Sequence, residues 1–169
     1  TNLTVSGTAE FASGTAANPE ITFIDDNDTG IYSPAANEIA ITTSATERLR
    51  VDNTGQVGIG TSSPQTNLHL SDSNPTIRLQ GGSTSSSTNQ ALGTIEFFSN
   101  DVSGDGPRVT SQIRGVTGES SSAVGGSIDF FTNSGATGTT LDHRMRIHRN
   151  GNVGIGTSTS GPAAKLDVV

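Results

Sequence analysis

Two acids in a short internal repeat are the residues best placed to perform hydrolytic chemistry. The segment 93–100 (GTIEFFSN) is similar to the segment 126–133 (GSIDFFTN), so Glu96 and Asp129 occupy equivalent positions. A glycan hydrolase needs two carboxylates that flank a glycosidic bond at a defined separation. The strand predicted between the two copies supplies two possible cationic partners, Arg108 and Arg114. We therefore interpret both acids as ion-paired structural residues, and catalysis stays open only if they line one groove together.

A denser acidic cluster partly resembles a calcium-binding loop. Asp25, Asn27, Thr29 and Gly30 match the first half of such a loop. The twelfth loop position should carry a bidentate Glu, and it is Ala36 here. The ligand set is incomplete, so we interpret the cluster as an acidic turn whose short side chains cap their own backbone.

The three histidines do not show metal-ligand spacing within one chain. His69, His143 and His148 form no His-x-His or His-x-x-x-His pair. A symmetry axis of an oligomer could still gather one histidine from each chain around a metal. Surface imidazoles are the preferred interpretation, and the sequence predicts no metal site.

The sequence shows no nucleophile for catalysis and no nucleotide-binding loop. The chain has no Cys, and Ser is so abundant that a Ser near a His is expected by chance. The segments 58–60 and 154–156 read Gly-x-Gly, without the third glycine and the following helix of a nucleotide-binding loop. We therefore predict no catalytic residue and no cofactor, and we expect that the protein is not an enzyme.

Composition and charge exclude several further classes. The formal net charge is −7 and there are only nine basic residues, which argues against a nucleic-acid partner. No apolar run approaches the length of a membrane span, so no membrane insertion is expected. The first residues are neither a Met start nor a signal peptide. We expect a fragment or a processed product.

The elements that must position these residues are short strands. Thr, Ser, Gly and Asn make up 79 of the 169 residues, and no sustained helical period occurs. The strands predicted outside the long repeat described next are 20–24, 38–42, 76–80, 94–99, 108–116 and 127–132. In the repeat 93–100 and 126–133, Ile and the first Phe should share one face of the sheet, and the acid and the second Phe the other.

A longer repeat predicts two β-hairpins. The segment 47–62 (ERLRVDNTGQVGIGTS) returns as 143–158 (HRMRIHRNGNVGIGTS), and apolar residues alternate on both arms. A three-residue loop with a left-handed Gly would pair Ile147 with Val153 and Met145 with Ile155. A two-residue loop would instead place Ile147 opposite Gly154.

We prefer the three-residue loop because it collects the apolar side chains on one face. That face would be buried and would carry four residues of the first copy, namely Leu49, Val51, Val57 and Ile59. On the other face, Arg48 and Arg50 would lie across Gly60 and Gly58.

The chain divides into three segments by pattern: 1–70, ending in the first hairpin; 71–142, a strand-rich middle; and 143–169, the second hairpin. Segments 81–90 and 118–122 are of low complexity and are predicted to be mobile loops.

One chain has too few apolar residues for a core of its own. Leu, Ile, Val and Phe make up only 36 of the 169 residues, and both faces of the Phe-Phe strands carry aromatic rings. We expect neighbouring copies in a symmetric oligomer to cover these faces. A two-layer sandwich within one chain is the alternative.

The long repeat, with Arg144-Met145-Arg146-Ile147 and Gly151-Asn152-Val153-Gly154-Ile155-Gly156-Thr157 as its clearest copy, resembles the repeat of bacteriophage tail fibres and related virion fibres. The segment 28–34 (DTGIYSP) also looks like one that precedes the repeat in such proteins. The resemblance implies an all-β, elongated homotrimeric fibre with hydrophobic burial between subunits. In many relatives the repeat precedes a self-cleaving intramolecular chaperone, whose cleavage residues this chain does not contain.

The sequence therefore favours a non-enzymatic structural component of a virion, an extracellular appendage that contributes to host attachment. Its expected partners are its own copies, other virion proteins and a host surface glycan or protein receptor. The loops proposed for attachment are 81–90, 100–107 and 115–125. The alternatives are a glycan-degrading tailspike that uses Glu96 and Asp129, or a bacterial surface adhesin.

Overall fold

A computed structural model of the chain describes residues 6–82, 89–103, 106–117, 125–134, 140–156 and 165–168. The sequence suggested three segments, whereas the contacts divide the chain into two compact units. Unit 1 is Thr1–Ile77 and unit 2 is Arg78–Val169, so the second hairpin belongs to the same unit as the middle strands. Each unit contains one β-sheet of six strands, and the all-β prediction is confirmed for the described part of the chain.

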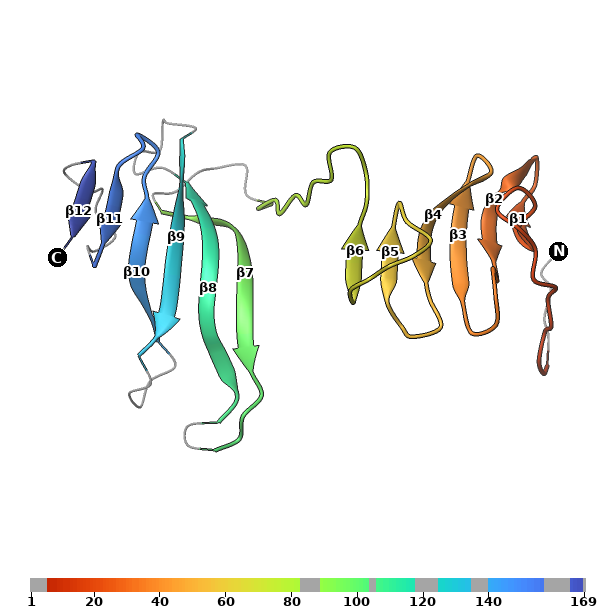
Figure 1. Cartoon of the computed structure of the whole chain (residues 1–169), viewed down its shortest axis with the longest axis horizontal. Helices are drawn as coiled ribbons and strands as arrows, with labels where there is room; N and C mark the ends of the chain where they lie inside the picture. Colours follow the sequence, from red (N-terminus) through yellow and green to blue (C-terminus); the bar gives the residue numbers. More distant parts are fainter. Residues whose placement is uncertain are drawn as a thin grey trace. The chain divides into compact units, whose positions relative to one another are not determined.

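The strands of unit 1 follow one another across its sheet in sequence order (Figure 1). They are β1 (Ile21–Phe23), β2 (Asp26–Tyr32), β3 (Ile39–Thr43), β4 (Thr46–Val51), β5 (Val57–Ile59) and β6 (Leu68–Leu70). All neighbouring pairs are antiparallel except β5 and β6, which are parallel.

Unit 2 repeats this arrangement (Figure 1). Its strands are β7 (Ala91–Ser99), β8 (Arg108–Thr117), β9 (Gly126–Asn133), β10 (Leu141–Ile147), β11 (Val153–Ile155) and β12 (Leu166–Val168). Again only the last pair, β11 with β12, is parallel. The two units are thus built to the same plan, with the repeated hairpin leading into a parallel edge strand in each.

Both hairpins adopt the register predicted from their three-residue loops. Leu49 pairs with Ile59 in the first copy, and Met145 pairs with Ile155 in the second. The turn glycines Gly55 and Gly151 both have φ of 85°, a left-handed conformation that Gly adopts without steric cost. In each loop the Gly amide donates to the carbonyl three residues before it, as in a type I turn followed by a bulge.

The glycines of the hairpin have a different role from the one expected. A Cβ on Gly60 would lie 2.1 Å from the carbonyl oxygen of Ser71, and a Cβ on Gly58 would lie 2.4 Å from that of Thr61. The expectation that Arg48 covers Gly60 is wrong, because the backbone near Ser71 occupies that space. Gly is required at both positions because another stretch of backbone passes directly over the strand.

Three of the observed strands were not predicted from the sequence, and one predicted strand is absent. The missed strands are β2, β6 and β12. The segment 76–80 forms no strand. It instead places Leu79 against β7, where a Cβ on Gly93 would lie 2.5 Å from Cβ of Leu79. This apolar residue packs on the face of a strand without joining the sheet.

Burial within each unit is the reverse of the usual pattern. Among the described residues, the buried hydrophobic side chains are only Tyr32, Ala40 and Val116. The largest fully buried side chains include Arg146, Thr42 and Asp129, which are polar or charged. In each sheet, we call the face that carries these buried polar side chains the polar face, and the opposite face the apolar face. A single chain therefore covers its polar faces and leaves its apolar faces open.

Candidate functional site

The apolar face of unit 1 carries a continuous row of aliphatic side chains across all six strands. Register pairs place the members of this row directly beside one another, in the order Ile21, Ile31, Ile41, Leu49, Ile59 and Leu70. A second row on the same face runs through Ile39, Val51, Val57 and Leu68. The ten positions form one aliphatic surface without a charged residue.

This surface is largely open to solvent in the single chain. The exposed fraction of its six most exposed members ranges from 37% for Ile31 to 55% for Leu68. Monomeric proteins rarely expose contiguous apolar surfaces of this extent, and such a surface normally marks an interaction site. The prediction that Leu49, Val51, Val57 and Ile59 share a face is confirmed, although within one chain that face is not the buried one.

Unit 2 has an equivalent row with larger side chains. The register pairs join Ile95, Ile113, Phe130, Met145 and Ile155 across β7 to β11. Phe97 lies on the same face as Ile95, two residues further along β7, and is 52% exposed. Both units therefore present an open apolar face at corresponding places in their sheets.

The polar face of unit 1 is held together by Arg50. Its guanidinium binds Glu38 at 2.7 Å and Glu47 at 2.7 Å, and Tyr32 donates a hydrogen bond to Glu47. Burial alone raises the pKa of Glu47, but hydrogen bonds from Arg50 and Tyr32 outweigh it and lower the pKa overall. Glu47 is thus held as a carboxylate, and its bond from Tyr32 joins β4 to β2.

Irregular segments of the chain itself cover this polar face. The side-chain hydroxyl of Thr42 donates to the carbonyl of Ala16, and Pro19 lies over Gly30. The connection between β5 and β6 covers Gly58 with Thr61. These segments exclude solvent from the polar face, and the carbonyl of Ala16 satisfies the buried hydroxyl of Thr42.

The polar face of unit 2 is centred on a buried ion pair. Asp129 receives two hydrogen bonds of 2.7 Å from Arg146, and Nε2 of His143 lies 3.3 Å from its Oδ1 atom. Arg146 is 1% exposed and Asp129 is 2% exposed. Burial raises the pKa of the Asp129 carboxyl, but hydrogen bonds from Arg146 and His143 outweigh it and lower the pKa overall.

Arg50 and Arg146 occupy equivalent positions of the long repeat, but their acids come from different places. In the first copy Glu47, on the same strand as Arg50, supplies a carboxylate. His143 stands at that position of the second copy, and Asp129 on the neighbouring strand β9 supplies the carboxylate instead. The arginine is thus the common element, and each unit pairs it in its own way.

The two acids proposed for catalysis lie on the polar face but are held apart by other side chains. Glu96 on β7 accepts a 2.6 Å hydrogen bond from Gln112, which in turn accepts one from Arg114. Arg114 stacks on Phe131, with Cζ 4.5 Å from the ring centroid. The prediction that Asp129 is ion-paired is confirmed, with Arg146 as the partner in place of the arginines proposed from sequence. A general acid in glycan hydrolysis needs a raised pKa, whereas that of Asp129 is lowered.

Two of the three histidines, His143 and His148, are not surface imidazoles, so the sequence interpretation is wrong for them, whereas His69 is half-buried. His148 is buried, and the side chain of His143 is only 9% exposed. His143 packs edge-on against Phe131, with ring centroids 5.1 Å apart. His143 reaches the polar face of unit 2 because the bulge at Arg144 shifts the alternation of side chains along β10, and His148 directly follows the end of that strand. No group of three His, Asp or Glu side chains able to hold a metal occurs within the part of the chain that the structure describes.

The acidic cluster is neither a calcium loop nor, for most of its length, a turn. Asp25 lies in the turn between β1 and β2 with φ of 65°, and the following residues from Asp26 onward form strand β2. Successive side chains of a strand point to opposite faces, so the backbone disperses these acids. The prediction of a turn is therefore correct only at Asp25.

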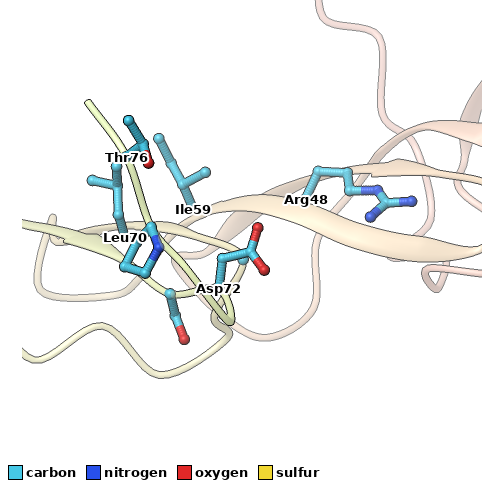
Figure 2. A pocket seen from close by; sticks show the side chains of 8 residues that line it. Arg48, Ile59, Leu70, Asp72 and Thr76 are labelled. Atoms are coloured by element: carbon cyan, nitrogen blue, oxygen red, sulfur yellow. The ribbon is translucent and has the colours of Figure 1, made fainter. Parts of the chain in front are cut away.

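A hollow beside the end of the β5–β6 pair is lined by mixed side chains (Figure 2). Figure 2 shows Ile59, Leu70 and Thr76 gathered at one side, and Arg48 directed away from them. Asp72 accepts hydrogen bonds from its neighbour Ser73, and Arg48 donates to Thr43. Local bonds thus engage both charged groups, and the hollow holds no assembled catalytic pair.

Parts of the loops proposed for host attachment fall outside the described residues, namely 83–88, 104–105 and 118–124. The low-complexity segment 118–122 lies entirely in that part. Residues 115–117 belong to strand β8, so the first part of the third proposed loop is a strand. The tip of the β7–β8 hairpin exposes Phe98 and Val102.

The chain matches no family model and no curated protein. In the described residues, no helix is long and apolar enough to cross a membrane.

Proposed function

We propose that the protein is a non-enzymatic structural component of a virion fibre that assembles as a homotrimer and contributes to host attachment. The observation that carries the proposal is the open aliphatic surface of unit 1, repeated with larger side chains in unit 2. In such a fibre these faces would pack against one another around a common axis and form the core that a single chain lacks.

The polar faces support the same proposal, because they are already covered within a single chain. The polar face of unit 1 carries ion pairs and lies under irregular segments of the same chain, and the polar face of unit 2 contains the buried pair of Arg146 and Asp129. The layer that a globular protein would use for its hydrophobic core is thus occupied by polar groups, and the apolar layer is left for contact with other chains. The Gly, Ser and Thr-rich connections would remain on the outside, where attachment surfaces are expected.

Substitution in the middle of the aliphatic surface tests the assembly. Ile41→Glu would place a charge between chains, and burial of an unpaired charge is strongly unfavourable. We expect this variant to lose the oligomer, measured as molar mass by light scattering. Ile24→Glu is the matched control because Ile24 is 93% exposed and lies in the β1–β2 turn, outside the surface. An Ile41→Glu variant that keeps the mass of the parent would contradict the proposed interface.

The role in attachment needs a test on particles. Antibodies raised against the purified chain should label an appendage of the virions by immunogold electron microscopy and should reduce adsorption to host cells. Particles that carry no label would contradict the assignment to a virion fibre.

The non-enzymatic character is tested by a sugar-release assay on host glycan. We expect no turnover. Turnover that Glu96→Gln or Asp129→Asn abolishes would establish a glycan-degrading tailspike instead.

A further inference from the structure

The sheet of unit 2 ends on one side in a long apolar strand. Of the four strands at the edges of the two described sheets, β1, β6 and β12 have three residues each, whereas β7 has nine. Ile95 and Phe97 are each 52% exposed, and Phe98 is 62% exposed. Natural proteins shorten or charge their edge strands, because a long apolar edge pairs readily with another strand. The edge of β7 is therefore a place where a further strand can bind.

The short internal repeat indicates which kind of strand fits this edge. Its two copies lie in β7 and β9, on the two sides of β8. The copy in β9 has a further neighbour, β10, whose Arg146 lies opposite Asp129 and binds it. Glu96 holds the position of Asp129 in the first copy, and no described strand lies on the outer side of β7. The copy in β7 thus lacks the arginine-bearing strand that the copy in β9 has.

The segment that precedes β7 contains a matching pattern. In Ile77-Arg78-Leu79 an arginine stands between two aliphatic residues, much as it stands between apolar residues in Met145-Arg146-Ile147 of β10. All three residues of the preceding segment are exposed and belong to no strand. Their backbone is therefore available for pairing.

The direction of this segment also fits. Leu79 lies at Gly93, and Gly81 lies at Leu92, since a Cβ on Gly81 would be 3.3 Å from the carbonyl oxygen of Leu92. The segment thus runs antiparallel to β7, as β10 runs antiparallel to β9. A shift of two residues along β7 would bring Leu79 beside Ile95. Two residues are the period of a strand, so Leu79 would keep the face on which it already packs.

We propose that segment 78–80 binds the free edge of β7 as an added antiparallel strand. Arg78 then lies opposite Glu96 and binds its carboxylate, and Leu79 lies opposite Ile95 on the apolar face. The added strand covers the long edge of the sheet and leaves the apolar face open to other chains. The inference does not depend on the proposed oligomer, because all of these residues belong to unit 2 of one chain.

Both partners have free capacity for this contact. Gln112 donates to the Oε1 atom of Glu96 at 2.6 Å, and a carboxylate accepts hydrogen bonds through both of its oxygens. Glu96 and Arg78 are exposed, so neither leaves a buried position to form the pair. An antiparallel neighbour uses only alternate backbone groups of a strand. Pairing with β8 therefore leaves the outer amides and carbonyls of β7 for the added strand.

A disulfide between two introduced cysteines tests the added strand, because the chain has no Cys of its own. The proposed register places Gln80 opposite Thr94, and opposite Cβ atoms of an antiparallel pair are about 4.5–5.5 Å apart. The full chain with Gln80→Cys and Thr94→Cys should therefore form an intramolecular disulfide in oxidised glutathione, measured by mass spectrometry. Thr94 alternates with Gly93 and points to the opposite face from the one on which Leu79 packs. The disulfide thus requires the segment to reach the edge.

Reversal of the charges tests the pair itself. In the double cysteine chain, Arg78→Glu alone or Glu96→Arg alone should slow disulfide formation about fivefold. The two substitutions together restore the opposite charges and should restore the rate. Arg78→Lys is the matched control, because it keeps the charge and should change the rate little.

Hydrogen exchange provides a readout that needs no cysteine. Alternate amides of β7 should exchange slowly in the parent chain and faster in Arg78→Glu, while the amides of β9 stay unchanged. Absence of the disulfide, or a charge reversal that fails to restore its rate, would overturn the inference. A disulfide that joins two chains would also overturn it, because a second copy would then supply the strand.

Discussion

Arg146 and Asp129 form the interaction on which the polar face of unit 2 depends. The arginine is almost completely buried and makes two 2.7 Å bonds to the carboxylate. Removing one partner of such a pair leaves a buried charge without compensation, which is costly even where the intact pair contributes little net stability.

The substitution Asp129→Asn should therefore destabilise unit 2 by about 3–5 kcal/mol. The measurement is the free energy of unfolding from urea titration. Asp142→Asn is the matched control, because its pair with Arg144 is about half exposed and should be worth less than about 1 kcal/mol. Equal effects of the two substitutions would contradict the importance of the buried pair.

Acid should weaken both polar faces for the same reason. The pKa values of Glu47 and Asp129 are lowered in the folded chain, so their stabilising contribution is present above their unfolded pKa values, near 4, and is lost as pH falls through the folded values. The urea midpoint at constant protein concentration should decrease from about pH 5 towards about pH 3. The Asp129→Asn variant should show a shallower decrease, and a midpoint that rises in acid would contradict this account.

The hairpins are the elements that the sequence predicted best. Two copies of one alternating pattern, each with a Gly at the end of a three-residue loop, fixed both register and turn, because a shift by one residue would split the apolar residues between faces. The copies even share a detail that the pattern did not predict. Arg48 and Arg144 are extra residues in bulges, and each donates from Nε to a Thr of the adjacent strand.

The edge strands could not be predicted with the same certainty. β6 and β12 have only three residues each, too few to show a period. The parallel pairing of β6 depends on a connection that passes over Gly58, and the partner of Asp129 depends on β9 lying between β8 and β10. The alternation of apolar and polar residues along one strand does not show which strands become neighbours or where the chain crosses a sheet.

The connection between β5 and β6 passes close over Gly58. Gly58→Ala places a methyl group 2.4 Å from the Thr61 carbonyl oxygen, so the β5–β6 connection must move, at a cost of about 1–3 kcal/mol. Gly55→Ala is the control, since its Cβ meets nothing within 4 Å and only the left-handed φ opposes it, at about 1–2 kcal/mol.

The discriminating readout is the local environment of β6. Amide hydrogen exchange of residues 68–70 should become faster in Gly58→Ala and stay unchanged in Gly55→Ala. Faster exchange in both variants, or in neither, would show that the close approach does not hold β6 in place.

At the scale of the whole molecule, one chain contains two sheets with polar faces covered and apolar faces open. The low apolar content of the sequence, with 36 Leu, Ile, Val and Phe among 169 residues, predicts a chain that needs neighbouring copies. Which residues form the open surface became clear only from the register pairs, which align ten aliphatic positions of unit 1 on one face. Hydrophobic burial is the main favourable contribution to folding, so surfaces of this kind are expected to be covered in the functional state.

The proposed trimer is best tested by the molar mass of the purified chain, measured by light scattering in buffer of about 0.15 M ionic strength. We expect a stable particle of three times the chain mass of 17.2 kDa. A folded particle with the mass of a single chain would contradict it.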